Sequence, residues 1–246
     1  ENLVYGGLWG ELLTNRKFAG HDNSRPRYRG SPRPWEFEYS DPNNFGLVTP
    51  WHPVQSDNTA SDSANGTVHF IHDNTTFYSG RQSLRIDLLV HDDKYHGIGQ
   101  SGLEIAGNTD YAVRVVLKTE GSINSLVLRL RDLEGDNGAL ELTLDSPESR
   151  FKTFTGILHS VRSGKSDFEL VARGKGQLWI GVVSAMRASS ALEGGIRSDI
   201  GTKIVEAGIK MLRWPGGNFA SDYLWMDGIG PIDRRPTRLN RAWNEL

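Results

Sequence analysis

Cysteine is absent from the 246 residues of this chain, and its absence removes several kinds of chemistry at once. Without cysteine the protein can form no disulfide, no thiolate metal site and no cysteine nucleophile. The same absence leaves the redox compartment open, because a cysteine-free chain is compatible with both oxidising and reducing surroundings.

Long apolar runs and a strong charge bias are also missing. No run approaches the roughly 20 residues that cross a bilayer, and no secretory signal opens the chain. The formal net charge is −2 with both signs mixed, so we expect neither nucleic acid nor a membrane as partner. The content of 37% hydrophobic and 24% charged residues is that of a globular protein with a sizeable core. The chain begins at Glu1 within an apolar pattern, which suggests a processed or partial polypeptide.

Apolar and polar residues alternate through the middle of the chain, from about Phe45 to Met186. The clearest examples are Leu84, Ile86, Leu88 and Val90; Tyr111, Val113, Val115 and Leu117; Leu126, Leu128 and Leu130; Leu140, Leu142 and Leu144; and Leu178, Ile180 and Val182. Alternation of this kind predicts half-buried antiparallel strands. Residues 134–138 and 173–176 are glycine-rich clusters that we interpret as turns. The middle therefore predicts an all-β domain, a β-sandwich or jelly roll.

A helical pattern returns near the end of the chain. An apolar stripe recurs every four residues at Ile196, Ile200 and Ile204, and Gly208 is placed to end that helix. Residues 209–214 then have the length of a buried strand, which Pro215 and two glycines stop. Helix, turn, buried strand and polar loop form one unit of a β/α barrel, in which substrates bind at the carboxyl ends of the strands.

The end of this predicted strand offers two candidate binding residues, Arg213 and Asn218. The alternative is that Arg213 only caps a strand and Asn218 only makes a turn. Residues 222–236 form a long loop rich in aromatic and ionic side chains. Such side chains suit a polyhydroxylated ligand, because its C–H faces stack on rings while its hydroxyls need fixed polar partners.

Other candidates have a structural alternative that weighs more. Residues 8–13 carry apolar side chains at helical spacing, and we interpret Glu11 and Arg16 beside them as a solvated face. Tyr95 is either a sugar-stacking ring or a packing residue. The acidic residues at 132–137 and the histidines match no metal template, so we expect no metal and no cofactor. The sequons at Asn65 and Asn74 permit N-glycosylation in a secreted eukaryotic protein.

Two stretches carry a resemblance to a known family. Residues 212–243, L-R-W-P-G-G-N-F-A-S-D-Y-L-W-M-D-G-I-G-P-I-D-R-R-P-T-R-L-N-R-A-W, closely resemble a region of the α-L-arabinofuranosidases of glycoside hydrolase family 51. Residues 5–18, Y-G-G-L-W-G-E-L-L-T-N-R-K-F, resemble the first barrel segment of the same enzymes. The middle of the chain resembles, more loosely, the carbohydrate-binding-like β-sandwich that some members insert between the first two barrel units.

The resemblance implies retaining hydrolysis of terminal arabinofuranosyl residues by two glutamates. In the family both glutamates lie on later barrel strands, so we expect no catalytic residue in this chain. By the same resemblance Asn218 binds sugar hydroxyls, Arg213 orients an active-site carboxylate, and Trp243 walls the substrate pocket.

The resemblance also divides the chain. We expect a first (β/α)8 barrel segment and linker over 1–33, an inserted β-sandwich over 34–190, and a second barrel unit with the substrate loop over 191–246. The expected partners are an arabinose-containing polysaccharide or oligosaccharide and the remainder of the same enzyme, possibly as a second chain. We expect the chain alone to be inactive. The competing hypothesis is a carbohydrate-binding module without catalysis. Location stays open, with secretion favoured unless the protein is bacterial.

Overall fold

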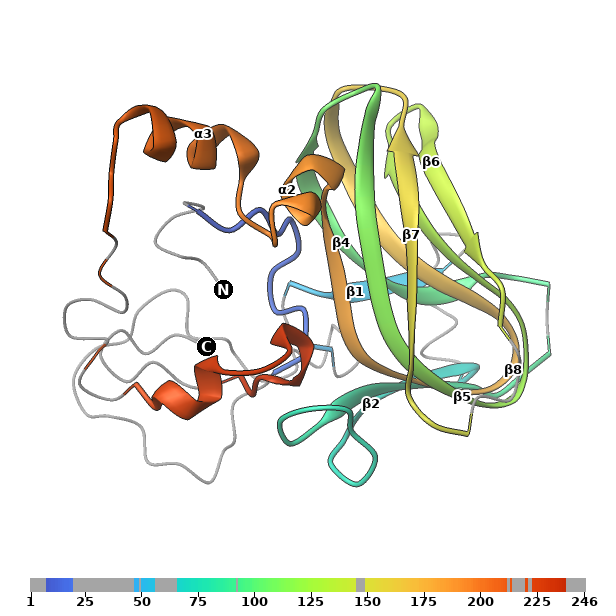
Figure 1. Cartoon of the computed structure of the whole chain (residues 1–246). Coiled ribbons are helices and arrows are strands. Elements are labelled where there is room, and N and C mark those ends of the chain that lie inside the picture. The colour runs from blue at the N-terminus through green and yellow to red at the C-terminus, as the bar shows by residue number, and fades with distance from the viewer. Residues whose placement is uncertain are drawn as a thin grey trace, which may run out of the picture.

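The computed structural model describes residues 8–19, 47–48, 50–55, 66–91, 93–144, 149–211, 213, 220 and 223–237. Its main body is one curled antiparallel sheet of eight strands (Figure 1). The strands are β1 (His52–Gln55), β2 (Val68–Asp73), β3 (Ser83–Leu88), β4 (His96–Ile105), β5 (Thr109–Asp132), β6 (Gly135–Leu142), β7 (Lys152–Ser160) and β8 (Gly164–Arg187). The helices are α2 (Ala188–Leu192), α3 (Ser198–Glu206), and the 3-10 turns η2 (Trp225–Gly228) and η3 (Ile232–Arg234).

Two strands of 24 residues each, β5 and β8, hold the sheet together. They pair with each other over almost their whole length, from Tyr111 opposite Arg187 to Arg131 opposite Asp167. The first half of β5 also pairs with β7, and its last part pairs with β6. Likewise β4 pairs with the first half of β8, and β3 with part of its second half. The sheet therefore folds into two layers, β2-β3-β8-β5-β7 and β1-β4-β8-β5-β6.

The bend between the layers lies at a pair of facing glycines, Gly121 and Gly176. Gly121 has φ +85°, which L side chains rarely adopt, and a Cβ there would lie 2.8 Å from the Cα of Gly176. The pairing of β5 with β8 shifts register just beyond, between Ile123 and Ser125. Both strands therefore bend at the same place, and they remain hydrogen-bonded to each other on both sides of the bend.

The predicted antiparallel strands are confirmed, with two corrections at this corner. The alternating residues 111–117 and 126–130 belong to one continuous strand, β5. Residues 173–176, which we interpreted as a turn, lie inside β8. The glycines bend the chain there, but hydrogen bonds to β5 continue across the bend, so no strand ends. The turn predicted at residues 134–138 is confirmed only at its start, where β5 and β6 form a hairpin at Asp132 and Gly135.

The core lies between the two layers and is made of the inward residues of the alternating pattern. Leu84 and Ile86 of β3, Leu126 and Leu128 of β5, and Ile180 of β8 are each no more than 1% exposed. They belong to one continuous cluster of buried apolar side chains. Because each strand sends alternate residues to this cluster, the period-two pattern of the sequence follows directly from the two-layer packing.

The N-terminal segment (residues 8–19) lies along β8 (Figure 1). The Leu12 amide donates to the Ala185 carbonyl at 2.9 Å, and the Val183 amide donates to the Arg16 carbonyl at 2.9 Å. The pairing of β3 with β8 stops at Ile180, which leaves the following edge of β8 available. The helical spacing of apolar side chains in residues 8–13 does not produce a helix, because Leu12 bonds to this edge and Gly10 bonds to the carbonyl of Gly195.

The helix predicted after the sandwich is confirmed as α3, and Gly208 follows its end with φ +68°. The buried strand predicted from residue 209 is not present in residues 209–211, where Ile209 is 49% exposed and Met211 84%. A parallel strand is buried only between neighbouring strands, and the described residues place none beside it. Leu212 and residues 214–219 lie outside the described residues. No described helix has the length and apolar character needed to cross a membrane.

The bend at Gly121 should make the stability of the fold sensitive to a side chain at that position. Gly121→Ala should cost about 3 kcal/mol of unfolding free energy, because a strained left-handed backbone is combined with overpacking against β8. Gly135→Ala is the matched control, since Gly135 has φ +112° but nothing within 4 Å of an added Cβ. It should cost about 1 kcal/mol. Urea unfolding of both variants checks this, and equal losses would contradict the role of the corner.

Candidate functional site

The structure tests little of the predicted substrate site. Arg213 is exposed and lies outside every helix and strand. Asn218 and Trp243 lie outside the described residues, so their proximity to Arg213 stays a prediction. Asn65 also lies outside the described residues, whereas Asn74 is exposed directly after β2. Its glycosylation stays a prediction as well.

The described residues do bring together charged side chains from three distant parts of the chain. Asp233 of η3 accepts two hydrogen bonds from Arg114 of β5, from Nε to Oδ2 at 2.6 Å and from Nη2 to Oδ1 at 2.9 Å. Arg16 of the N-terminal segment donates from Nη1 to the same Oδ1 at 3.3 Å. The side chains of Arg16 and Asp233 are only 4% and 12% exposed. Such a two-pronged, enclosed ion pair fixes both position and orientation.

Glu11 extends this cluster into β8. Its Oε2 accepts from the Ser184 hydroxyl at 2.6 Å, and its Oε1 accepts from the Ala185 amide at 2.8 Å. Arg16 Nη1 lies 3.9 Å from Oε2. Burial raises the pKa of the Glu11 carboxyl, although the bond from Ser184 and the charge of Arg16 oppose that rise. Glu11 therefore attaches the N-terminal segment to β8, although its burial makes the ionised form of its carboxyl less favourable.

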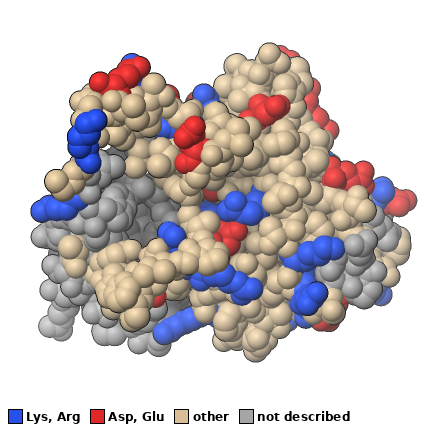
Figure 2. Space-filling model, viewed as in Figure 1, with Lys and Arg blue, Asp and Glu red and all other residues tan. Residues whose placement is uncertain are grey.

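Two further side chains hold η3 in place. Lys17 donates from Nζ to the carbonyl of Ile232 at 3.0 Å and also bonds the carbonyl of Arg235. Arg234 donates from Nη1 to the Tyr78 carbonyl at 2.7 Å, and its guanidinium carbon lies 3.7 Å from the centre of the Tyr78 ring. Figure 2 shows basic and acidic side chains meeting in the middle of this face. We call Glu11, Arg16, Arg114 and Asp233 the junction cluster.

Sequence reasoning missed the junction cluster. Glu11 and Arg16 were interpreted as a solvated face, but both side chains are at most 4% exposed. Asp233 stood out only as one ionic residue in a long loop, and Arg114 occupied an outward position of a predicted strand. The members lie 119 and 217 residues apart, from Asp233 to Arg114 and to Arg16, so no local pattern links them.

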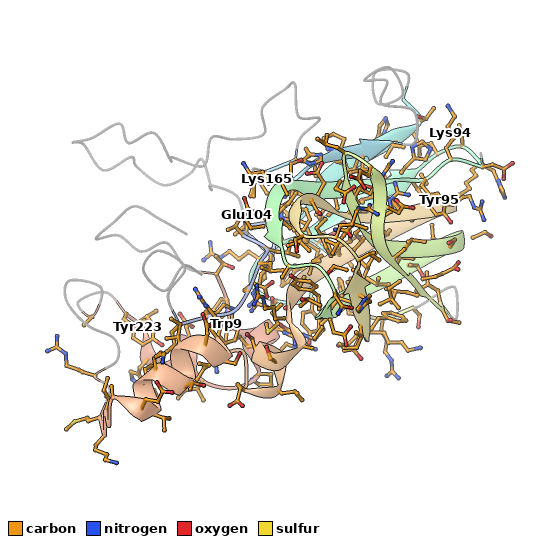
Figure 3. All side chains as sticks on the ribbon, turned by 90° about the horizontal axis from the view of Figure 1, so that it is seen from above. Trp9, Lys94, Tyr95, Glu104, Lys165 and Tyr223 are labelled. Atoms are coloured by element: carbon orange, nitrogen blue, oxygen red, sulfur yellow. The ribbon has the colours of Figure 1, made fainter. Side chains whose placement is uncertain are left out.

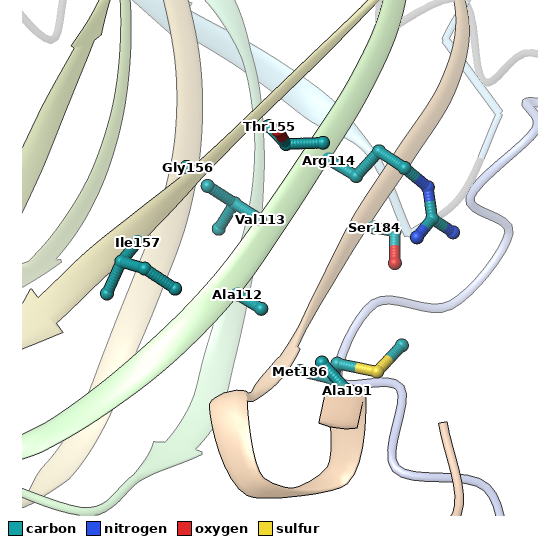
Figure 4. A pocket seen from close by; sticks show the side chains of 9 residues that line it. All are labelled: Ala112, Val113, Arg114, Thr155, Gly156, Ile157, Ser184, Met186 and Ala191. Atoms are coloured by element: carbon teal, nitrogen blue, oxygen red, sulfur yellow. The ribbon is translucent and has the colours of Figure 1, made fainter. Parts of the chain in front are cut away.

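A hollow of about 290 Å³ lies beside the cluster on the outer face of the sandwich (Figure 4). Its walls are mainly apolar, with the guanidinium of Arg114 and the hydroxyls of Thr155 and Ser184 as polar groups. The lining residues are Ala112, Val113, Arg114, Thr155, Gly156, Ile157, Ser184, Met186 and Ala191. The residues that the structure describes contain no group of three or more His, Asp or Glu that could hold a metal ion.

Tyr95 lies at the other end of the molecule from Trp9 and Tyr223 (Figure 3). Its hydroxyl is 3.2 Å from the Ser125 Oγ, and the guanidinium carbons of Arg129 and Arg173 lie 5.9 and 5.3 Å from its ring centre. A ring already packed by two cations has less face to offer a sugar. Of the two interpretations of Tyr95, the structure favours packing.

Comparison with known proteins begins with a negative result, since no family model matches the chain. Short stretches do resemble curated enzymes. The intracellular exo-α-(1→5)-L-arabinofuranosidase of Acetivibrio thermocellus is 43% identical over 58 residues, which are 24% of this chain and 12% of that protein. Its counterpart in Bacillus subtilis is 49% identical over 51 residues, 21% of this chain and 10% of that protein. The match thus spans about a tenth of the length of these relatives.

Among solved structures, an arabinose-bound GH51 α-L-arabinofuranosidase is similar over 96% of this chain and 36% of its own, with a TM-score of 0.66 and 19% identity. That identity supports a shared fold. The curated relatives and this structure are all arabinofuranosidases, so the predicted resemblance to that family is confirmed.

The ion pair of the junction cluster should dominate the attachment of η3. Asp233→Asn keeps the shape of the side chain but leaves the buried guanidinium of Arg16 and the partly exposed one of Arg114 without their carboxylate. We expect a loss of about 3 kcal/mol of unfolding free energy. Asp199→Asn is the matched control, because Asp199 pairs with Arg197 at 2.6 Å on the exposed surface. Its loss should be much smaller. Urea unfolding measures both losses. Similar losses would show that the junction pair stabilises the protein no more than the surface pair does.

Glu11 should make stability depend on pH. Because its folded pKa is raised above the ordinary 4.5, the folded state holds the proton more tightly, and stability falls as pH rises through and above 4.5. Wild type should therefore lose stability relative to Glu11→Gln as pH rises from 4 toward 7. Glu193→Gln, at an exposed position, is the control and should follow wild type. A relative gain by wild type over that interval would contradict the assignment.

Proposed function

We propose that this chain is part of a retaining glycoside hydrolase that releases terminal α-L-arabinofuranosyl residues from arabinoxylan or arabinan. The observation that carries the proposal is the 43–49% identity of short stretches to arabinofuranosidases. In this proposal residues 1–33 and 191–246 belong to a (β/α)8 barrel, and residues 34–190 form the inserted sandwich. Arg213, Asn218 and Trp243 bind substrate, and the two catalytic glutamates lie outside this chain.

The proposed role of the sandwich is to hold the two barrel segments in place. The junction cluster supports this role, because Glu11, Arg16 and Asp233 tie the N-terminal segment and η3 to the same face of β5 and β8. A binding module on a flexible linker needs no such buried ion pairs. The substrate loop, residues 222–236, is thereby anchored at its far end to a rigid body.

Exposed apolar side chains support the idea that more polypeptide covers the terminal segments. In the described residues Leu192, Val205, Met211, Trp225 and Met226 are 66–88% exposed. The apolar side chains of α3 lie along one side of the helix, yet none of its residues is buried. Apolar patches of this kind usually mark contact surfaces. Here the proposed contact is with the remainder of the barrel.

Activity measurements test the proposal directly. The complete polypeptide that contains this chain should hydrolyse p-nitrophenyl α-L-arabinofuranoside, whereas the 246-residue chain alone should not. In the complete polypeptide Asn218→Ala should lower kcat/KM by about 10- to 100-fold, since a sugar hydroxyl loses its proposed hydrogen-bond partner. Asn74→Ala, on the exposed turn after β2, is the control and should leave kcat/KM unchanged.

Three outcomes would contradict the proposal in different ways. Hydrolysis by the 246-residue chain alone would contradict its inactivity. Hydrolysis of another aryl glycoside in preference would contradict the substrate. Saturable binding of arabinoxylan oligosaccharides without any hydrolysis by the complete polypeptide would favour the carbohydrate-binding module instead.

A further inference from the structure

Arg16 is enclosed but only partly hydrogen-bonded. Its Nη1 donates to Asp233, whereas Nε and Nη2 are inaccessible to solvent and have no acceptor among the residues that the structure describes. A guanidinium group is always charged and carries five N–H donors. Leaving two of its nitrogens dry and unpaired is costly, and native proteins meet such groups with an ion or an ordered water.

Arg16 has only one carboxylate within hydrogen-bond distance among the described residues. Arg16 and Arg114 share a single firm anion, Asp233, through the same Oδ1 atom. Glu11 is the other carboxyl nearby, but its Oε2 is 3.9 Å from Arg16 and is taken by Ser184. Arg16 therefore has one close carboxylate partner, and that carboxylate contacts only its Nη1.

Arg114 is also not fully paired by Asp233. Asp233 uses its Nε and Nη2, which leaves Nη1 outside this bidentate pair. The side chain lines the hollow of about 290 Å³ and is 30% exposed (Figure 4). The hollow therefore opens onto the Arg114 side of the junction cluster.

We infer that the junction cluster receives one further carboxylate, held by the Nε and Nη2 edge of Arg16. A carboxylate fits this edge because its two oxygens match the two parallel N–H directions of the guanidinium fork. It also carries a charge opposite to that of Arg16, which an ordered water does not. The carboxylate comes either from a side chain of the polypeptide that completes the enzyme, a source that rests on the proposed function, or from a free acid.

Sodium acetate is the probe. The Nε–H resonances of arginine in the ¹⁵N-labelled 246-residue chain are recorded while acetate replaces chloride at constant ionic strength. The Arg16 resonance should shift and saturate, with half-saturation on the order of 10 mM. At ten times that concentration the folding equilibrium constant should rise roughly ten-fold. An Arg16 resonance that does not move would overturn the inference and leave a buried water as the partner.

Two variants make the test specific. Arg16→Lys keeps the charge but lacks the planar edge, so the acetate-dependent rise in stability should disappear. Arg85→Lys is the matched control, because Arg85 also has an enclosed Nε without a hydrogen bond but already pairs with Asp73 and Asp87. It should retain the acetate response. If Arg16→Lys fails to fold, the wild-type titration decides alone, with the resonance assigned through its sequence neighbours.

The same titration on the complete polypeptide separates the two sources. A side-chain carboxylate in the site would abolish the response to acetate there, whereas a site for a free acid would respond in both proteins. Neither result depends on hydrolysis of an arabinofuranoside, so failure of this inference and failure of the proposed function are distinguishable.

Discussion

The pairing of β5 with β8 is the constraint on which the rest of this structure depends. Each strand runs through both layers, and the two bend together at Gly121 and Gly176. Because the other strands attach to one half or the other of this ladder, either directly or through a neighbour, both layers are fixed relative to each other by continuous backbone hydrogen bonds. Side-chain packing then fills a space whose shape the ladder has already set.

The β5–β8 ladder also provides the surface to which the N-terminal segment and η3 attach. The pairing of β3 stops at Ile180, which leaves the last part of β8 open to the N-terminal segment. On the outer face, Arg114 of β5 and Ser184 of β8 stand opposite each other in register. These two side chains bond to Asp233 and Glu11, so one surface carries both the N-terminal segment and η3. The attachment is electrostatic, and its strength comes from exclusion of water.

This arrangement gives the sandwich a mechanical role in the proposed glycosidase. A substrate loop needs a fixed position, because small displacements of binding residues cost much of the rate. The junction cluster supplies such an anchor at η3, within the loop of residues 222–236. Tyr95, by contrast, has its ring against two guanidinium groups, which makes it a packing element of the sandwich. The described contacts are those that the proposed scaffold role requires.

The sequence by itself determined the all-β middle, the helix that ends before Gly208, and the resemblance to arabinofuranosidases. These depend on local periodicity, on one glycine and on contiguous motifs, which a linear pattern carries. Only the tertiary structure decided that residues 173–176 continue a strand, that residues 8–13 form no helix, and that Glu11 and Arg16 are buried. In each case the deciding partner is remote in sequence: β5 for the glycine bend, the open edge of β8 for the N-terminal segment, and Asp233 for Arg16. Burial and charge pairing depend on which residues, distant in sequence, come into contact, and a local sequence pattern does not specify those contacts.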